Sequence, residues 1–245
     1  MEILRLAERN ISISGLSDSF PDFARDYLCE AETPDFSVNC TSEDIAREQK
    51  KSEEEAVLEG IKPRLWPAPY LETLAVYRKI AEKMPAYDTF LFHGSVIAVD
   101  GEAFLFTAKS GTGKSTHTRL WREYFGDRVF MVNDDKPLLR VLPDGSVTAY
   151  GTPWNGKHHL SRNIGVPLKA VCILTRDTYN HIERLTAEEA YASLYQQVYH
   201  PKEGEALLKT LELLDILCKN VGLYRLGCNM DPEAARVAYE GMTRG

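Results

Sequence analysis

The 245-residue sequence predicts an α/β protein with a mixed β-sheet whose faces carry helices. The sheet is predicted because hairpin-like strand pairs occur together with strand-loop-helix units, and one of these units contains a glycine-rich loop. A charge-rich stretch at residues 46–64 sets a small β-rich N-terminal module apart from the rest of the chain. The last third of the sequence has the pattern of a helical tail.

The N-terminal module is predicted from alternating side chains. Apolar and polar residues alternate through residues 3–16 on either side of a polar turn at residues 8–10, which is typical of a β-hairpin. A short helix is expected at residues 20–28 and a strand at residues 36–40. The hydroxyl of Thr41 is then placed to accept the first free backbone N–H groups of a helix.

The charge-rich stretch at residues 46–64 has few large apolar side chains, so we interpret it as a linker or a solvated edge. A boundary near Lys62 gives two predicted domains, residues 1–62 and residues 63–245. The second domain opens with a helix over residues 70–84 that is expected to face the core through Leu71, Leu74, Ala75, Ile80 and Met84.

The central sheet is predicted from apolar stretches that turn signals separate. Asp100-Gly101 joins the first two strands, and Pro143-Asp144-Gly145 forms the turn of a later hairpin. Strands are expected at residues 89–100, 102–108, 128–135 and 169–176, and the hairpin covers residues 138–150. A mixed sheet follows from this combination of hairpins and strand-loop-helix units.

The C-terminal third is predicted to be helical. Thr186 and Glu189 have the spacing of a capping box, and residues 203–219 carry an apolar stripe at helical spacing. Asp231-Pro232 is typical of a helix start, since proline is favoured at the first helical position.

Charge and composition indicate the kind of partner and compartment. The net charge of -7 disfavours non-specific binding to nucleic acid or to anionic membranes. No signal peptide and no membrane span are expected, and the five scattered cysteines are interpreted as free thiols of a reducing compartment. We therefore expect a cytoplasmic protein with small-molecule or protein partners.

The glycine-rich loop Ala108–Ser115 lies between an expected strand and an expected helix at residues 115–125, the context in which backbone N–H groups hold phosphate. Alanine stands where the strict pattern has its first glycine. Gly111 and Gly113 permit positive φ angles and close approach of the backbone to a ligand. Lys114 is expected to reach the β- and γ-phosphates of a nucleotide, and the Ser115 hydroxyl to bind Mg²⁺.

Two adjacent acids, Asp134 and Asp135, follow the expected strand at residues 128–135, at the sheet edge where α/β proteins gather ligands. One carboxylate can bind metal while the other accepts a proton from an attacking hydroxyl. A pair of aspartates after a strand also occurs as plain turn chemistry. His93 lies in the strand before the loop strand, and it suits either a buried structural role or the phosphate site.

With His93-Gly94, the glycine loop and the Asp134-Asp135 pair in this order, the chain resembles the HPr kinase/phosphorylase superfamily over about residues 88–176. The sequence of the loop is similar to that of phosphoenolpyruvate carboxykinases, and the chain is most similar to the uncharacterised SerK-like branch of the superfamily. The resemblance implies a P-loop kinase fold, contact of His93 with the transferred phosphate, Asp134 as general base and Asp135 at the metal site. It also implies that a nucleotide is bound by Ser110, Gly111, Thr112, Gly113, Lys114, Ser115 and Thr116.

The chain departs from that superfamily at residues 151–157. The bifunctional enzymes have a Glu-x-Arg-Gly stretch there, whereas this segment contains no carboxylate, so neither phosphorylase activity nor HPr as substrate is expected. A basic run that follows suits either a clamp for an anion or a solvated loop: Lys157, His158, His159 and Arg162. Trp154 either closes a pocket or fills a core corner.

The sequence thus predicts a nucleotide- and Mg²⁺-dependent kinase, with ATP or another nucleotide as phosphoryl donor, that phosphorylates a hydroxyl of a serine-like small molecule or of a peptide or protein serine. The alternative is a catalytically silent nucleotide-binding protein that regulates or scaffolds a biosynthetic complex. The chain is too short for a complete carboxykinase. The resemblance also allows a homo-oligomer, because the related bacterial kinases assemble as hexamers. The acceptor and the donor nucleotide are not determined by the sequence.

Overall fold

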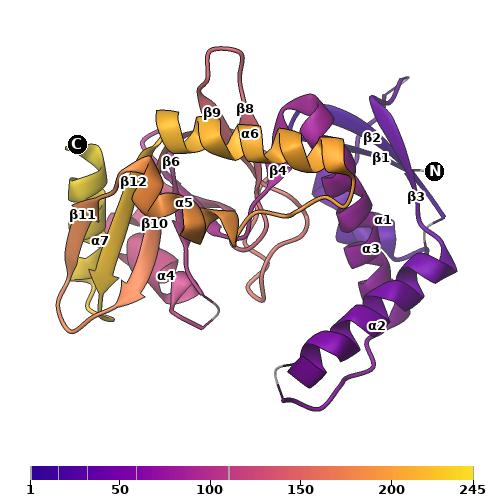
Figure 1. Cartoon of the computed structure of the whole chain (residues 1–245), viewed down its shortest axis with the longest axis horizontal. Coiled ribbons are helices and arrows are strands. Elements are labelled where there is room, and N and C mark those ends of the chain that lie inside the picture. Colours follow the sequence, from indigo (N-terminus) through magenta and orange to yellow (C-terminus); the bar gives the residue numbers. More distant parts are fainter. Residues whose placement is uncertain (1, 16, 32, 59, 110, 245) are drawn as a thin grey trace. The chain divides into compact units, whose positions relative to one another are not determined.

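The computed structural model describes residues 2–15, 17–31, 33–58, 60–109 and 111–244. The chain forms two compact units, Met1–Lys83 and Met84–Gly245 (Figure 1). Helix α3 (Ala68–Lys83) packs on helix α2 (Ser42–Leu58), so it belongs to unit 1. The boundary expected from the sequence, near Lys62, assigns this helix to the second domain instead.

Unit 1 is a three-stranded sheet with helices. Strand β1 (Glu2–Leu6) pairs antiparallel with β2 (Arg9–Ser14), and β2 pairs parallel with β3 (Phe36–Asn39). The predicted hairpin is confirmed, with Ala7 and Glu8 at φ angles of 45° and 63° in its two-residue turn. The short helix α1 and the 3-10 turn η1 follow β2 and cover Phe20–Phe23 and Arg25–Tyr27.

Of the two interpretations of the charge-rich stretch, a linker or a solvated edge, the linker is wrong, because most of that stretch belongs to α2. Its crowded charges are pairs one helical turn apart, such as Lys50 with Glu54 at 3.8 Å and Lys51 with Glu55 at 3.6 Å. Glu48 is buried and forms an ion pair with Arg78 of α3. The helix therefore has one solvated face and one face fixed against α3.

Unit 2 contains a mixed sheet, as predicted. Its strands follow the order β4-β8-β9-β10-β6-β5-β7, while β12 pairs with β10 and β11 pairs with β12. Strand β10 is parallel to β6 and β12 and antiparallel to β9. The bounds are β4 Thr89–Leu91, β5 Ser95–Val99, β6 Glu102–Thr107, β7 Val129–Asn133, β8 Leu138–Val141, β9 Val147–Tyr150, β10 Gly165–Arg176, β11 His181–Arg184 and β12 Gly222–Cys228.

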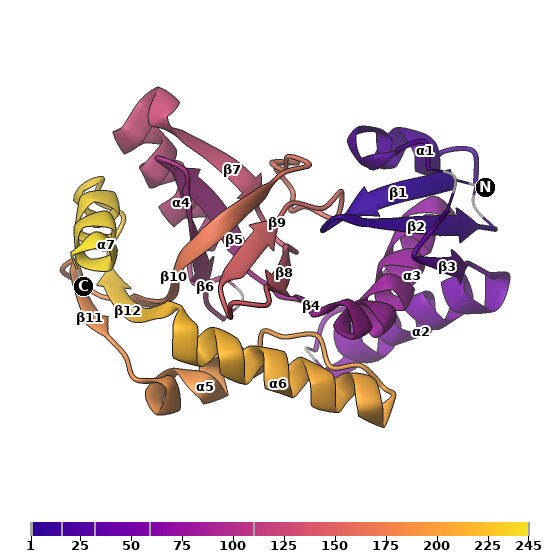
Figure 2. The same cartoon turned by 90° about the horizontal axis from the view of Figure 1, so that it is seen from above.

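Helices cover both faces of this sheet (Figure 2). Helices α5 (Ala187–Tyr195) and α6 (Gly204–Asn220) pack on one face around Leu194 and Leu214. Helices α4 (Lys114–Phe125) and α7 (Glu233–Thr243) pack on the other face, where Trp121 is fully buried. The 3-10 turns η2 and η3 cover Met84–Tyr87 and Gly126–Arg128.

Two predicted elements differ from the structure. The strand expected at residues 89–100 is broken at residues 92–94, and its halves β4 and β5 occupy different positions in the sheet. At the break, a side chain on Gly94 would meet the carbonyl oxygen of Phe106 at 3.0 Å, and the N–H of His93 donates to Gln197 instead of to a strand. The tail predicted as helical also contains β11 and β12, which complete the sheet beside β10.

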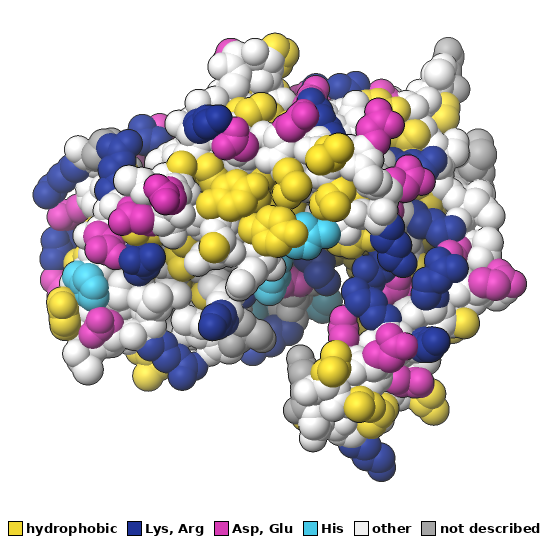
Figure 3. All heavy atoms as spheres, viewed as in Figure 1, with side chains coloured by type: hydrophobic (Ala, Val, Ile, Leu, Met, Phe, Trp, Pro, Cys, Tyr) yellow, Lys and Arg dark blue, Asp and Glu magenta, His cyan; other side chains and the backbone are white. Residues whose placement is uncertain are grey.

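Acidic and basic side chains are interspersed over the face shown in Figure 3, where hydrophobic side chains gather over α5 and α6. Tyr191 and Tyr195 of α5 stack with ring centroids 6.4 Å apart. None of the helices in the described ranges is both long and apolar enough to cross a membrane.

Candidate functional site

The glycine loop connects the end of β6 to the start of α4, as the sequence predicts. Gly111 and Gly113 have φ angles of 75° and 127°, which side chains rarely adopt. A Cβ on either residue would meet no atom within 4 Å, so backbone conformation and not crowding requires glycine here. Helix α4 begins at Lys114 and presents its N-terminal N–H groups toward the loop. Ser110, one of the predicted nucleotide-binding residues, lies outside the described residues.

The loop is held by side chains at both ends. The Lys114 Nζ donates to the carbonyl oxygen of Ala108 at 3.2 Å. Arg176, at the end of β10, donates to the carbonyl oxygens of Gly111 at 2.5 Å and Thr112 at 3.4 Å. Burial lowers the pKa of Lys114, while the charge of Asp135 acts in the opposite direction, so the lysine is within electrostatic reach of the acidic pair.

Asp134 follows directly on β7 and is only 8% exposed. Its Oδ1 accepts a hydrogen bond from the backbone N–H of Gly156 at 2.6 Å. Burial raises the pKa of the Asp134 carboxyl above its ordinary value, although the Gly156 hydrogen bond acts in the opposite direction. A buried carboxylate with a raised pKa is a stronger proton acceptor than a solvated one, which suits a general base.

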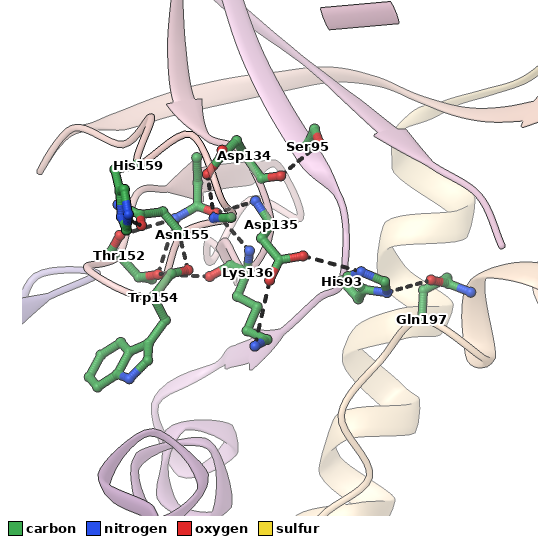
Figure 4. A network of polar contacts seen from close by, with 12 residues as sticks. His93, Ser95, Asp134, Asp135, Lys136, Thr152, Trp154, Asn155, His159 and Gln197 are labelled. Atoms are coloured by element: carbon green, nitrogen blue, oxygen red, sulfur yellow. Dashed lines mark hydrogen bonds and ion pairs between the residues drawn. The ribbon is translucent and has the colours of Figure 1, made fainter. Parts of the chain in front are cut away.

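Asp135 lies between His93 and Lys136 (Figure 4). Its Oδ1 lies 3.3 Å from His93 Nε2, and its Oδ2 lies 3.5 Å from Lys136 Nζ. Burial alone would raise the pKa of Asp135, but the hydrogen bond from His93 and the nearby charges of Lys136 and His93 outweigh burial and lower it. The two adjacent acids therefore have pKa shifts of opposite direction, and Asp135 is the one held ionised.

His93 is itself oriented from its other ring nitrogen. Its Nδ1 lies 3.1 Å from Oε1 of Gln197, which follows α5. Since the amide oxygen of Gln197 can only accept, Nδ1 carries the proton of this hydrogen bond. The other ring nitrogen, Nε2, faces Asp135. The structure thus joins His93 to the acidic pair, although the histidine lies in a break between strands and not within one.

Asn133 is a site residue that the sequence analysis did not single out. Its Oδ1 accepts from the backbone N–H groups of Asp135 at 2.8 Å and Lys136 at 2.6 Å. Its Nδ2 donates to the backbone oxygen and to the hydroxyl oxygen of Thr152, both at 3.1 Å. Asn133 and Thr152 are fully buried and fix the backbone that carries both aspartates. In the sequence, the only indication of this role is that Asn133 is a polar residue at the end of an apolar strand.

The segment at residues 151–157, where the chain departs from the superfamily, supports the site through its backbone. A Cβ on Gly156 would lie 3.1 Å from Oδ2 of Asp134, and a Cβ on Gly151 would collide with the carbonyl oxygen of Arg162. Trp154 is 4% exposed and fills the interior. The side chains of the basic run Lys157, His158, His159 and Arg162 are exposed.

The structure therefore brings His93, Asp134 and Asp135 into one network, with Lys114 close to Asp135. Ser115 is exposed and Thr116 half-buried in the first turn of α4. Among the described residues no group of three or more His, Cys, Asp or Glu side chains converges as a metal centre. The roles of Ser115 and Asp135 toward a metal remain predictions.

Comparison with known proteins gives one family match. The model of the family described as "SynChlorMet cassette protein ScmC" matches residues 69–230, which include His93, Asp134, Asp135 and the glycine loop. No curated protein matches the chain. A solved structure that resembles it is the Hpr(Ser) kinase/phosphatase from Coxiella burnetii, with 8% sequence identity, a TM-score of 0.36, and coverage of 63% of this chain and 97% of that chain.

Proposed function

This chain belongs to the SynChlorMet cassette protein ScmC family, and we propose that it is a nucleotide- and Mg²⁺-dependent kinase that phosphorylates a hydroxyl group. The observation that carries the proposal is the pair of adjacent aspartates, Asp134 buried and Asp135 half-buried, with pKa shifts of opposite direction, held beside a glycine loop that opens a helix. A loop of this kind binds phosphate groups, and the acids supply what transfer of a phosphoryl group to a hydroxyl requires.

In the proposed reaction the acceptor oxygen bonds to the γ-phosphorus of the nucleotide while the bond from that phosphorus to the β-γ bridging oxygen breaks. The bridging oxygen keeps the bonding electron pair and leaves with the nucleoside diphosphate. The hydroxyl proton passes to the Asp134 carboxylate, which Gly156 holds in place. Such a transfer needs positioning and charge neutralisation more than covalent help from the protein.

The described residues fit a nucleotide with its metal. Gly111 and Gly113 leave the loop backbone open to phosphate oxygens, and the Lys114 ammonium lies at the start of α4. Ser115 and Asp135 are oxygen ligands of the kind Mg²⁺ prefers, and this ion usually takes one or two protein oxygens together with phosphate oxygens and water. When bound, Mg²⁺ would neutralise charge on the phosphates. His93 and Lys136 hold Asp135 ionised for that role.

The proposal is tested by incubating the protein with γ-labelled ATP and Mg²⁺ together with free serine, free threonine, glycerate or serine-containing peptides. We expect the label to appear on one class of acceptor. Binding of the nucleotide is measured separately by calorimetry. Tight nucleotide binding with neither transfer nor hydrolysis would contradict the kinase and would favour the regulatory or scaffold protein.

A further inference from the structure

A cavity of about 400 Å³ lies beside the glycine loop in unit 2. It is lined by the end of β6 and the loop, by the ends of β10 and α5, and by one residue of β12. Thr112 of the glycine loop is among its described lining residues, whereas Lys114 and Ser115 are not, so the cavity adjoins the start of α4 where the phosphates are expected.

The cavity reaches the acidic network through two of its lining residues. Gln197 lines it and also fixes the His93 ring, whose other nitrogen faces Asp135. Thr107 lines it and donates its hydroxyl to the backbone oxygen of His93 at 3.0 Å. A molecule in this cavity therefore lies against the residues that hold His93 beside the reacting groups.

The lining is cationic. Lys109, Arg176 and Arg225 contribute to it, and the described lining contains no carboxylate. Arg225 is neutralised by Glu183 at 2.7 Å, but neither Lys109 nor Arg176 pairs with a carboxylate in the part of the chain that the structure describes. Two positive charges without a counter-charge favour an anionic ligand.

The remaining lining argues against a nucleobase or a peptide. Hydroxyls and amides such as Ser193 and Gln197 make up half of the described lining residues, and that lining has no aromatic ring on which a base would stack. The volume is at the lower end of the range for small-molecule sites, and it suits a compact molecule more than an extended chain.

We propose that this cavity binds the phosphoryl acceptor and that the acceptor is a small hydroxyl compound with an anionic group. The anion would lie against Lys109 and Arg176, and the hydroxyl would be directed toward Asp134. This inference rests on the proposed kinase function and narrows its substrate class. The anion can be a carboxylate or a phosphate, which different acceptors distinguish.

The test compares acceptors that differ only in the anion. With γ-labelled ATP and Mg²⁺, the wild-type protein should use glycerate or glycerol phosphate with kcat/KM at least about 10-fold above that of glycerol, since a charge-assisted hydrogen bond contributes that much discrimination. Which of the two charged compounds is preferred identifies the anion. Equal use of glycerol and both anions, or label on serine peptides alone, would overturn the inference.

The variant Lys109→Gln should raise KM for the charged acceptor about 10-fold and leave the Kd for ATP within a few-fold. Lys169→Gln is the matched control. Lys169 lies on β10, is paired with Glu102 at 3.2 Å and does not line the cavity, so its removal should leave both quantities unchanged. An unchanged KM in Lys109→Gln would also overturn the inference.

A binding measurement separates the two proposals. Calorimetry of the nucleotide-free protein with glycerate and with glycerol phosphate should detect binding of one of them that Lys109→Gln weakens and Lys169→Gln preserves. If that binding were present without transfer to any acceptor, the kinase would be contradicted and the anion site would stand. If transfer occurred but neither anion bound, the kinase would stand and the anion site would be contradicted.

Discussion

At the scale of residues, the site depends on the different environments of two neighbouring acids. Asp134 is buried and accepts a hydrogen bond from the backbone N–H of Gly156, whereas Asp135 lies between His93 and Lys136. The proton-accepting role and the metal-binding role are thereby separated within one dipeptide. The arrangement has a cost in stability, because an ionised Asp134 is poorly solvated.

Replacing Asp134 with asparagine should therefore stabilise the protein at neutral pH. The folded pKa of Asp134 is raised above 3.8, so its ionisation costs the folded state free energy at pH values above that folded pKa, and the cost vanishes below 3.8. We expect the melting temperature of Asp134→Asn at pH 7 to exceed that of the wild type by a few degrees. Thermal unfolding at several pH values checks this, and a gain that persisted undiminished below 3.8 would rule out ionisation of Asp134 as its cause.

The variant Gly156→Ala should disturb the same carboxylate by sterics. Its Cβ would lie 3.1 Å from Oδ2 of Asp134, closer than most side-chain contacts, so the carboxylate or the loop must shift. We expect turnover to fall about 10-fold or more while nucleotide affinity changes little. Gly204→Ala, in the first turn of α6 with no atom within 4 Å of the added Cβ, is the control that should leave turnover unchanged.

At the scale of elements, the glycine loop is fixed from a strand that is distant in the sequence. Arg176 ends β10, the strand parallel to β6, and its guanidinium holds two carbonyl oxygens of the loop. With those two carbonyls bound by Arg176, the backbone N–H groups of the loop are left for the ligand. The parallel pairing of β6 and β10 thus contributes directly to the predicted nucleotide site.

Arg176→Gln should consequently weaken nucleotide binding even though the residue is not part of the loop. We expect a rise in the Kd for ATP of about 10-fold, the scale of one or two hydrogen bonds from a charged donor. Calorimetry with ATP and Mg²⁺ measures it. An unchanged Kd would show that Lys114 and the helix start are sufficient to hold the loop.

Short sequence patterns predicted many of the helices, strands and loops around the candidate site. The loop, its flanking strand and helix, the acidic pair and the capping box at Thr186 are each encoded within a few residues, and the structure contains all of these elements. The hydrogen-bond partners of the site residues could not be predicted from such patterns, because they are distant in the sequence. Gln197 lies 104 residues from His93, and Gly156 lies 22 residues from Asp134. Strand β12 was missed because its position depends on pairing with β10.

At the scale of the whole molecule, every described residue of the candidate site belongs to unit 2, while unit 1 has its own sheet and buried side chains. One buried group links the stability of unit 2 to pH. His117 of α4 is 2% exposed, accepts a hydrogen bond from Trp121 Nε1 at 3.0 Å, and has no partner for Nδ1 among the described residues. Burial lowers its pKa to about 3.

The protein should lose stability in acid partly through His117. Because the unfolded chain takes up this proton near pH 6.5 and the folded chain only near 3, the free energy of unfolding falls as the pH drops through that window. One proton gives a slope of at most about 1.4 kcal/mol per pH unit. Urea unfolding at several pH values should show a smaller slope for His117→Gln and an unchanged slope for His158→Gln, whose side chain is exposed.

The central claim, that Asp134 accepts the proton in phosphoryl transfer to a hydroxyl, is tested most directly by the rate of label transfer from γ-labelled ATP at saturating nucleotide. Wild type and Asp134→Asn are compared with the acceptor that the wild type uses. We predict turnover at least about 10²-fold lower in the variant, with the Kd for ATP within a few-fold of the wild type. Equal turnover in the two proteins, or loss of turnover and affinity together, would contradict the role assigned to Asp134.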